Sequence, residues 1–179
     1  MELKFRPLKA EEIECRVNQI NEEYLTLLLY KDARCDMNIL DETVGAMNWE
    51  RDHIELKGNI YCGVSIYDKE KEDWVTKWDA GKESNTEAEK GEASDSFKRA
   101  CVNWGIGREL YTAPFIYIPA NKTKIYQNNK GKFVTNDKFK VEKIKYNDKR
   151  EIIGLSIKNN RNERVFIYAT EEAKNENNK

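Results

Sequence analysis

Between Glu11 and Leu28, apolar residues recur every three or four positions. Such a period places apolar side chains along one side of a helix, so it predicts an amphipathic helix over this segment. Residues 37–44 have a similar pattern and are followed by Gly45, a residue type that commonly ends helices. We therefore expect two helices at the start of the chain.

After residue 53, the period of the apolar residues changes to two. Residues 54–56, 60–66 and 74–78 each alternate between apolar and polar side chains, which is typical of strands. Gly58-Asn59 separates the first two runs, at a place where a two-residue hairpin turn needs positive φ. These runs predict a meander of three antiparallel strands.

The strongest helix signal follows this meander. Residues 84–87 and 86–89 each fit a capping box, in which a Ser or Thr hydroxyl and a Glu carboxylate satisfy the free amides of the first turn. An apolar stripe then runs from Phe97 to Trp104 at helical spacing, and Gly105 follows as a natural stop. We expect one long helix that buries this stripe.

Beyond Pro114 the sequence again has the pattern of strands. Asn and Asp residues that favour turns separate the later runs, and no apolar residue follows Ala173. We expect residues 169–179 to be a disordered tail. Strands are predicted at residues 115–118, 140–145, 152–157 and 165–168.

The composition allows a folded domain but gives no strong sign of a nucleic-acid partner. The chain has 179 residues, enough for a core without disulfide or metal staples. Its net charge is −1 and its pI is about 6.0, whereas nucleic-acid-binding domains usually have a pI above ~9. The charge is uneven, however, because residues 121–164 hold thirteen Lys and Arg against five Asp and Glu. A basic face can therefore exist on a nearly neutral molecule.

Cysteine and histidine usage argues against a zinc site. The four cysteines are widely spaced and His53 is the only histidine, whereas structural zinc usually needs four Cys or His ligands in paired clusters. The chain has no apolar N-terminal segment typical of a secretion signal and no apolar run of membrane length. We expect a protein of the reducing cytoplasm, without a membrane partner, whose cysteines are core residues.

Lys98 and Arg99 are the first candidates for function. They lie about 100° and 200° around the helix from Phe97, so both point away from the core if Phe97 is buried. Lysine supplies a point charge and arginine a planar fork, and together they could hold successive phosphates. An ordinary solvated helix face is the alternative, and spacing alone favours it.

Trp74 and Trp78 are the second candidates, because they share one face of a predicted strand. Exposed aromatic rings stack on the bases of single-stranded nucleic acids. The alternative is that both rings pack on the helix stripe of Phe97 and Trp104. We favour packing, since large aromatic side chains dominate protein cores.

A third candidate is a metal-dependent nuclease site. Glu55-Leu56-Lys57 matches the acidic-x-Lys signature of many such enzymes, and Asp41 or Asp36 could supply the second carboxylate for Mg²⁺. Alternation also places Glu55 and Lys57 on one solvent-facing side of the strand, where their charges need no catalytic explanation. A subunit-interaction module whose charges only keep it soluble is a further alternative.

The segment 86–111, with Ser94-Asp95-Ser96-Phe97-Lys98-Arg99-Ala100 at its centre, resembles the signature helix of the Rad52 superfamily. The resemblance is closest to the phage branch of Sak-type single-strand annealing proteins. The preceding elements agree in order: the Leu40–Gly45 helix end, Trp49, and the meander. The similarity covers roughly Leu25 to Pro114.

This resemblance implies an α+β fold in which an antiparallel β-meander packs on a long helix, as a β-β-β-α core with extra C-terminal strands. It implies one annealing domain over residues 1–168, with a core at about 25–118 and a β-rich extension at about 119–168. Copies of the chain would assemble side by side into a ring or a helical filament. Such a protein anneals single-stranded DNA in phage-type recombination and double-strand break repair, without a cofactor and without being an enzyme.

The resemblance also implies which residues contact DNA. Lys98 and Arg99 match the pair that lines the DNA groove, Arg34 is similar to another groove arginine, and Lys57 to a basic position that helps hold a second strand. Val102 departs from the pattern, because the eukaryotic members have a further DNA-contacting arginine there. A bacterial host cytoplasm is the implied location, and a phage exonuclease or a single-strand binding protein are further candidate partners.

Overall fold

The computed structural model describes residues 3–81 and 88–176, and the chain folds into two compact units. The capping boxes predicted within 84–89 depend on residues outside the described ranges. Both units contain antiparallel strands, so the α+β fold class is confirmed. Unit 1 comprises Met1–Arg6 and Asp32–Arg108, and unit 2 comprises Pro7–Lys31 and Glu109–Lys179.

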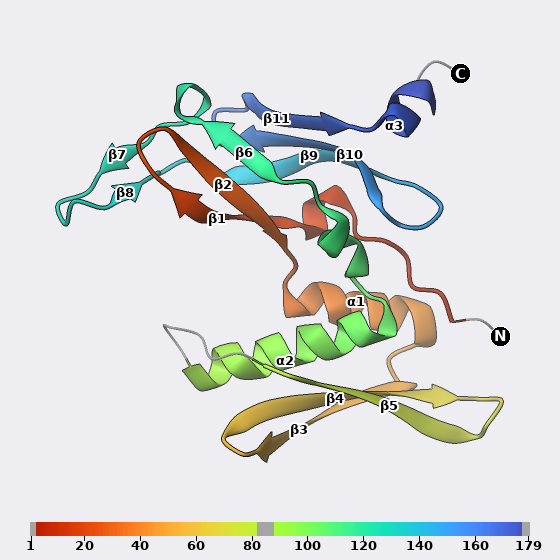
Figure 1. Ribbon diagram of the computed structural model, residues 1–179. Coiled ribbons are helices and arrows are strands. Elements are labelled where there is room, and N and C mark those ends of the chain that lie inside the picture. Colours follow the sequence, from red (N-terminus) through yellow and green to blue (C-terminus); the bar gives the residue numbers. More distant parts are fainter. Residues whose placement is uncertain (1–2, 82–87, 177–179) are drawn as a thin grey trace. The chain divides into compact units, whose positions relative to one another are not determined.

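Unit 1 is a three-stranded meander covered on one face by helices (Figure 1). The meander and both of its helices agree with the sequence predictions. Helix α2 packs on β4 and β5, and α1 packs on α2 and β3. The elements are α1 (Ala33–Val44), β3 (Trp49–Leu56), β4 (Asn59–Asp68), β5 (Asp73–Ala80) and α2 (Ala88–Trp104).

The turn between β3 and β4 lies one residue earlier than predicted. Leu56 pairs with Asn59, so the two turn residues are Lys57 and Gly58, with φ values of 54° and 78°. Both positive values suit a tight hairpin, and Gly58 adopts its value without a steric penalty. The prediction placed Asn59 in the turn because Asn also tolerates positive φ, but the ladder begins at this residue.

The predicted apolar stripe of α2 forms much of the unit 1 core. Phe97, Ala100 and Cys101 are fully buried. Close docking of the N-terminal half of α2 is fixed by Glu92, whose buried carboxylate accepts a hydrogen bond from the Ile60 amide at 2.7 Å. A charged acceptor that is satisfied in this way holds the helix in register against β4.

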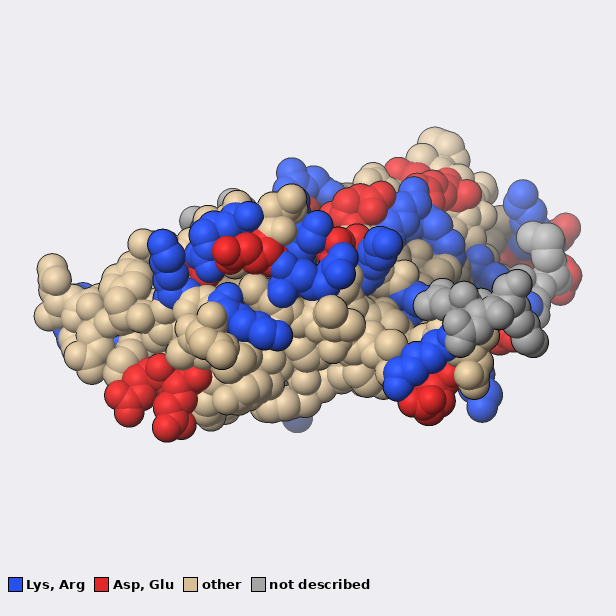
Figure 2. Space-filling view, turned by 90° about the horizontal axis from the view of Figure 1, so that it is seen from above, with Lys and Arg blue, Asp and Glu red and all other residues tan. Residues whose placement is uncertain are grey.

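Unit 2 is a six-stranded antiparallel sheet with the order β11-β10-β9-β1-β2-β6. Its edge strands β6 and β11 contact each other, so the sheet curls around its own apolar face. The predicted C-terminal strands are confirmed, and Figure 2 shows a face of this unit on which Lys and Arg side chains gather among a few acids. The sheet strands are β1 (Glu14–Ile20), β2 (Tyr24–Tyr30), β6 (Ile116–Pro119), β9 (Phe139–Tyr146), β10 (Ile152–Asn159) and β11 (Arg164–Ala169).

Short elements complete the described part of unit 2. A two-stranded hairpin interrupts the chain between β6 and β9, and 3-10 turns precede β1, precede β6 and follow it. These elements are η1 (Ala10–Glu12), η2 (Arg108–Thr112, which starts at the end of unit 1), η3 (Ala120–Lys122), β7 (Tyr126–Gln127), β8 (Phe133–Val134) and α3 (Glu171–Glu176).

The amphipathic helix predicted between Glu11 and Leu28 is wrong, because this segment forms the hairpin β1-β2. Asn21 makes the turn, since its side-chain oxygen accepts hydrogen bonds from two following amides. Leu25, Leu27 and Leu29 are buried with a period of two, whereas Leu28 is 44% exposed. Apolar residues on both faces of the strands produced an accidental helical spacing.

Helix α3 lies within the segment for which the sequence predicts a disordered tail. The Thr170 hydroxyl accepts a hydrogen bond from the Ala173 amide, and Ala173 is buried. A capped first turn and one buried apolar side chain explain why this part of the tail is helical. Residues 177–179, the last part of the predicted tail, lie outside the described ranges.

The cysteines are core residues, as the sequence predicts. Cys35, Cys62 and Cys101 are buried and Cys15 is half-buried, and all four are free thiols. Burial raises the pKa of the Cys15 thiol to about 12 and that of Cys62 to about 11, so both remain protonated at neutral pH. No helix in the described ranges is both long and apolar enough to cross a membrane.

Candidate nucleic-acid interface

Lys98 and Arg99 are both half-buried on α2, next to the buried Phe97. The ring of Phe97 stacks on Trp49 at a centroid distance of 6.2 Å, and the Arg51 guanidinium lies 4.8 Å from its centre. These contacts fix the rotation of α2 about its axis. The two cations therefore lie beside the core rather than in it, as the helical spacing predicts.

Arg99 is held by a carboxylate on the neighbouring strand. Its Nε donates to Oδ1 of Asp79 at 3.2 Å, and the side chains of Arg99 and Asp79 are 41% and 24% exposed. The described residues place no hydrogen-bond acceptor on the two terminal nitrogens of Arg99. A guanidinium gripped at Nε can present its terminal fork to a phosphate.

Asp79 is itself fixed at both oxygens. Oδ1 also accepts from the Ala80 amide at 2.8 Å, and Oδ2 accepts from Nδ2 of Asn103 at 3.2 Å. The same Asn103 nitrogen lies 3.0 Å from the Trp78 carbonyl oxygen. Asn103, Asp79 and Arg99 thus form a chain of hydrogen bonds in which the position of each side chain restricts the next.

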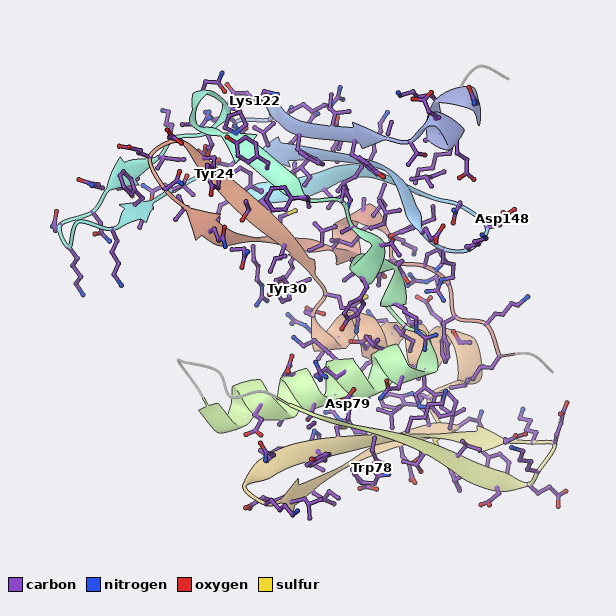
Figure 3. All side chains as sticks on the ribbon, viewed as in Figure 1. Tyr24, Tyr30, Trp78, Asp79, Lys122 and Asp148 are labelled. Atoms are coloured by element: carbon purple, nitrogen blue, oxygen red, sulfur yellow. The ribbon has the colours of Figure 1, made fainter. Side chains whose placement is uncertain are left out.

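The interpretation that Trp74 and Trp78 pack on the α2 stripe is wrong. Both rings lie on the face of the meander opposite α2, and they are 40% and 43% exposed. Figure 3 shows Trp78 and Asp79 on opposite sides of β5. Trp78 instead covers Gly63, where an added Cβ would meet the indole ring at 2.7 Å.

The outer face that carries these two tryptophans is not basic. Glu50 and Asp52 alternate onto the same side of β3 and are exposed, next to the apolar side chains of Ile54 and Leu56. Carboxylates at this density disfavour a phosphate backbone. The exposed rings alone therefore do not make this face a site for single-stranded DNA.

Arg34 and Lys57 lie at two different places in unit 1. Arg34 is in the first turn of α1, its side chain is 83% exposed, and its Nε donates to Asp32 at 3.2 Å. Lys57 is exposed in the β3-β4 turn. The hydrogen bond from Ile60 to Glu92 places this turn near the N-terminal half of α2, and Lys98 follows Glu92 by about 9 Å of helix.

Two cations at the C-terminal end of α2 were not found from the sequence. The Arg108 guanidinium donates to the carbonyl oxygens of Val102 at 2.9 Å and Asn103 at 3.2 Å. Lys77 Nζ donates to the Asn103 oxygen at 2.9 Å and lies 4.4 Å from the centre of the Trp104 ring. The carbonyl oxygens at the C-terminal end of a helix have no partners within the helix and attract cations. The predicted helix end at Gly105 was therefore the feature of the sequence that could have pointed to these two residues.

The residues of the nuclease alternative are not brought together. Asp41 accepts a hydrogen bond from the Trp49 indole at 2.6 Å, at the start of β3, whereas Glu55 lies about 20 Å further along this strand. Asp36 is fully buried in α1. Among the described residues, no group of three or more His, Cys, Asp or Glu is placed to hold a metal ion.

Comparison with known proteins identifies a family. Searches of curated proteins and of solved structures each return no match. The family model described as Rad52/22 family double-strand break repair protein matches residues 4–133, which include all of the candidate cations above. Because the match extends over well over half of the chain, the protein belongs to the Rad52/22 family of double-strand break repair proteins.

Proposed function

We propose that this protein binds single-stranded DNA and anneals complementary strands in phage-type recombination. The observation that carries the proposal is the Asn103-Asp79-Arg99 chain of hydrogen bonds, which orients the Arg99 guanidinium next to Lys98 on the same helix. Phosphate contacts of this kind position a strand without reading its bases. A protein that holds strands by their phosphates leaves the bases available for pairing.

We assign Arg34 and Lys57 to the same function as secondary contacts. The Arg34 side chain is more exposed than that of Arg99, at 83% against 41%, and its charge lies at the end of a helix that packs on α2. Lys57 would contact a second strand at the β3-β4 turn. Arg108 supplies a positive charge at Val102, where the family pattern has an arginine that this chain lacks.

Assembly into a ring or filament is part of the proposal. One copy has a net charge of −1, so a single site offers few phosphate contacts. Side-by-side copies repeat the same local cations along one strand, and the contacts add up. Annealing then needs neither ATP nor a metal, because the chain only holds the strands and performs no covalent chemistry. A phage exonuclease or a single-strand binding protein would be the partner that supplies the single strand.

The test is annealing of complementary labelled oligonucleotides in EDTA and, separately, in Mg²⁺. Annealing that persists in EDTA, with strands of unchanged length, is expected. Shortened strands that appear only with Mg²⁺ would refute the proposal in favour of a nuclease. If the strands neither anneal nor shorten in either condition, the remaining hypothesis is a subunit-interaction module.

The site is tested with Lys98→Ala combined with Arg99→Ala, which should abolish single-strand binding while preserving the fold and the assembly. Lys69→Ala with Lys71→Ala removes the same charge from the exposed β4-β5 turn and is the matched control. Thermal melting and size-exclusion chromatography check folding and assembly, and Arg99→Gln keeps a donor for Asp79 if the alanine variant unfolds. Unchanged affinity in a folded Lys98/Arg99 variant would overturn the site assignment.

A further inference from the structure

The outer face of the unit 1 meander, which is turned away from α2, leaves large apolar side chains exposed. Strand pairing places Ile54, Leu56, Trp74 and Trp78 on this face, and their side chains are between 40% and 51% exposed. Ile54 lies directly opposite Tyr61 on β4. Helices α1 and α2 both pack on the other side of the sheet (Figure 1). Single exposed apolar residues are common, but a group of this size on one face is typical of a binding surface.

The aromatic rings of this face are held in place by the protein itself. Trp78 pairs with Gly63, and the six-membered part of its indole lies directly over this glycine, where an added Cβ would stand 2.7 Å from the ring. The Trp74 ring meets the Tyr67 ring edge to face at a centroid distance of 5.5 Å. Rings that are already fixed lose little conformational freedom on binding, so they are effective anchors in protein interfaces.

The charged side chains of the outer face are all acidic. Glu50 and Asp52 alternate onto it from β3, and neither forms a hydrogen bond or an ion pair within the described ranges. Arg51 and Lys77, the basic residues of the three strands, both lie on the face toward α2. The outer face therefore combines aromatic rings on β5 with unpaired carboxylates on β3. Such a surface repels a phosphate backbone and attracts a basic, apolar partner.

We propose that the outer face binds an amphipathic helix of another protein, with apolar side chains on the tryptophans and lysines or arginines beside Glu50 and Asp52. A helix there would cover the second face of the sheet, as α1 and α2 cover the first. The patch extends along β4 from Tyr61 to Tyr67, about 20 Å, which a helix of about 13 residues spans. Carboxylates on one side only would fix the orientation of the bound helix.

This protein-binding surface is distinct from the α2 site and does not depend on the proposed function. Figure 3 shows Trp78 pointing away from Asp79, on opposite sides of β5. The competing explanation is that the acids protect an edge, because β3 is an edge strand and charged side chains there discourage pairing with other sheets. Edge protection explains the carboxylates but not the exposed apolar side chains, and it predicts no preference for a basic peptide.

The experiment uses two labelled peptides of about 15 residues, both amphipathic helices with leucines on one side. One carries lysines on its other side and the second carries glutamates. Fluorescence anisotropy with the full chain should show binding of the lysine peptide that is about tenfold tighter than that of the glutamate peptide, since two ion pairs are exchanged for two repulsions. Equal affinity for the two peptides would overturn the proposal.

The charge requirement is tested with Glu50→Lys combined with Asp52→Lys, which should reverse the preference so that the glutamate peptide binds more tightly. The matched control is Glu22→Lys with Glu23→Lys, because it makes the same change of charge at exposed positions in the β1-β2 turn. The control should keep the preference of the wild type. If the two variants behave alike, the peptides respond to net charge and the proposal fails.

The apolar requirement is tested with Ile54→Thr combined with Leu56→Thr, which keeps strand propensity and should weaken binding of the lysine peptide about tenfold. Its matched control is Leu28→Thr with Ile167→Thr, at positions of unit 2 that are 44% and 68% exposed. Equal affinities of this variant and its control would overturn the proposal.

Size-exclusion chromatography and strand annealing separate the remaining explanations. Assembly and annealing by the folded Ile54/Leu56 variant should match the wild type, so failure of peptide binding and failure of the proposed function are distinguishable. A change in assembled size that the control does not show would place the face between copies of the chain and refute a different protein as its occupant. Melting curves confirm that each variant is folded.

Discussion

Asp79→Asn removes the charge that grips Arg99 while keeping the size of the side chain. In the structure, Asp79 Oδ1 holds Arg99 Nε at 3.2 Å, and Asn103 holds the other oxygen. If Asp79 orients the guanidinium for phosphate, the variant should bind single-stranded DNA less tightly. If Asp79 only competes with phosphate for Arg99, the variant should bind more tightly.

The magnitudes favour the first result. Immobilising a long side chain on binding costs about 0.5–1.5 kcal/mol of free energy. Because Asp79 already holds the Arg99 side chain in the free protein, the wild type loses little of this free energy when it binds DNA. Against this, a carboxylate about 8 Å from a phosphate in water repels it by about 0.5 kcal/mol, and salt at about 0.15 M reduces that to about 0.2. The net loss is about 1 kcal/mol, a weakening of about fivefold at each site.

Fluorescence anisotropy with a labelled oligonucleotide measures the effect, and Asp52→Asn is the control. Asp52 carries the same charge on the outer face of β3, so its loss should leave affinity unchanged or slightly higher. In an Arg99→Ala background, Asp79→Asn should no longer weaken binding, because Asp79 acts through Arg99. Tighter binding by Asp79→Asn than by Asp52→Asn would refute the positioning role.

Two further predictions concern stability. Gly81→Ala should destabilise unit 1 by about 3 kcal/mol in urea denaturation. The added Cβ would stand 2.2 Å from the Glu92 carbonyl oxygen and push α2 away from the sheet. An unchanged denaturation midpoint would contradict this close packing. Asp137→Asn should cost unit 2 about 1 kcal/mol at pH 7. Because the pKa of Asp137 is lowered from 3.8 in the folded state, its stabilisation is present above pH 3.8 and is lost as pH falls through the lowered pKa. The difference between wild type and variant should therefore shrink in strong acid, and a constant difference would argue against the ion pair as its cause.

The sequence predicted the elements of unit 1 well because the apolar patterns of α2 and β4 coincide with buried faces. The stripe from Phe97 to Cys101 is buried, and alternation along residues 60–66 places Cys62, Val64 and Ile66 toward α2. The hairpin β1-β2 could not be predicted in the same way. Its apolar residues lie on both faces, so the decisive signal was the Asn21 turn and not the period.

The candidate site was predicted only in part, for a similar reason. The position of Lys98 and Arg99 beside the core follows from the period of a single helix, which can be read from neighbouring residues alone. Asp79 lies twenty positions before Arg99, and its role depends on which face of β5 turns toward α2. The face on which Trp74 and Trp78 lie depends on the same register, and the general tendency of aromatic side chains to be buried predicts the wrong face.

A near-neutral chain can bind a polyanion if its acids are placed to neutralise chosen cations and leave others exposed. In unit 2 three carboxylates pair with arginines and several lysines stay exposed, whereas in unit 1 a carboxylate orients the arginine beside Lys98. A pI of about 6.0 averages over both arrangements and therefore says little about local potential. Removing a paired acid should then have different consequences in the two units. Asp79→Asn should weaken DNA binding through Arg99, whereas Glu142→Gln should release Arg164 and Lys158 and destabilise the sheet of unit 2.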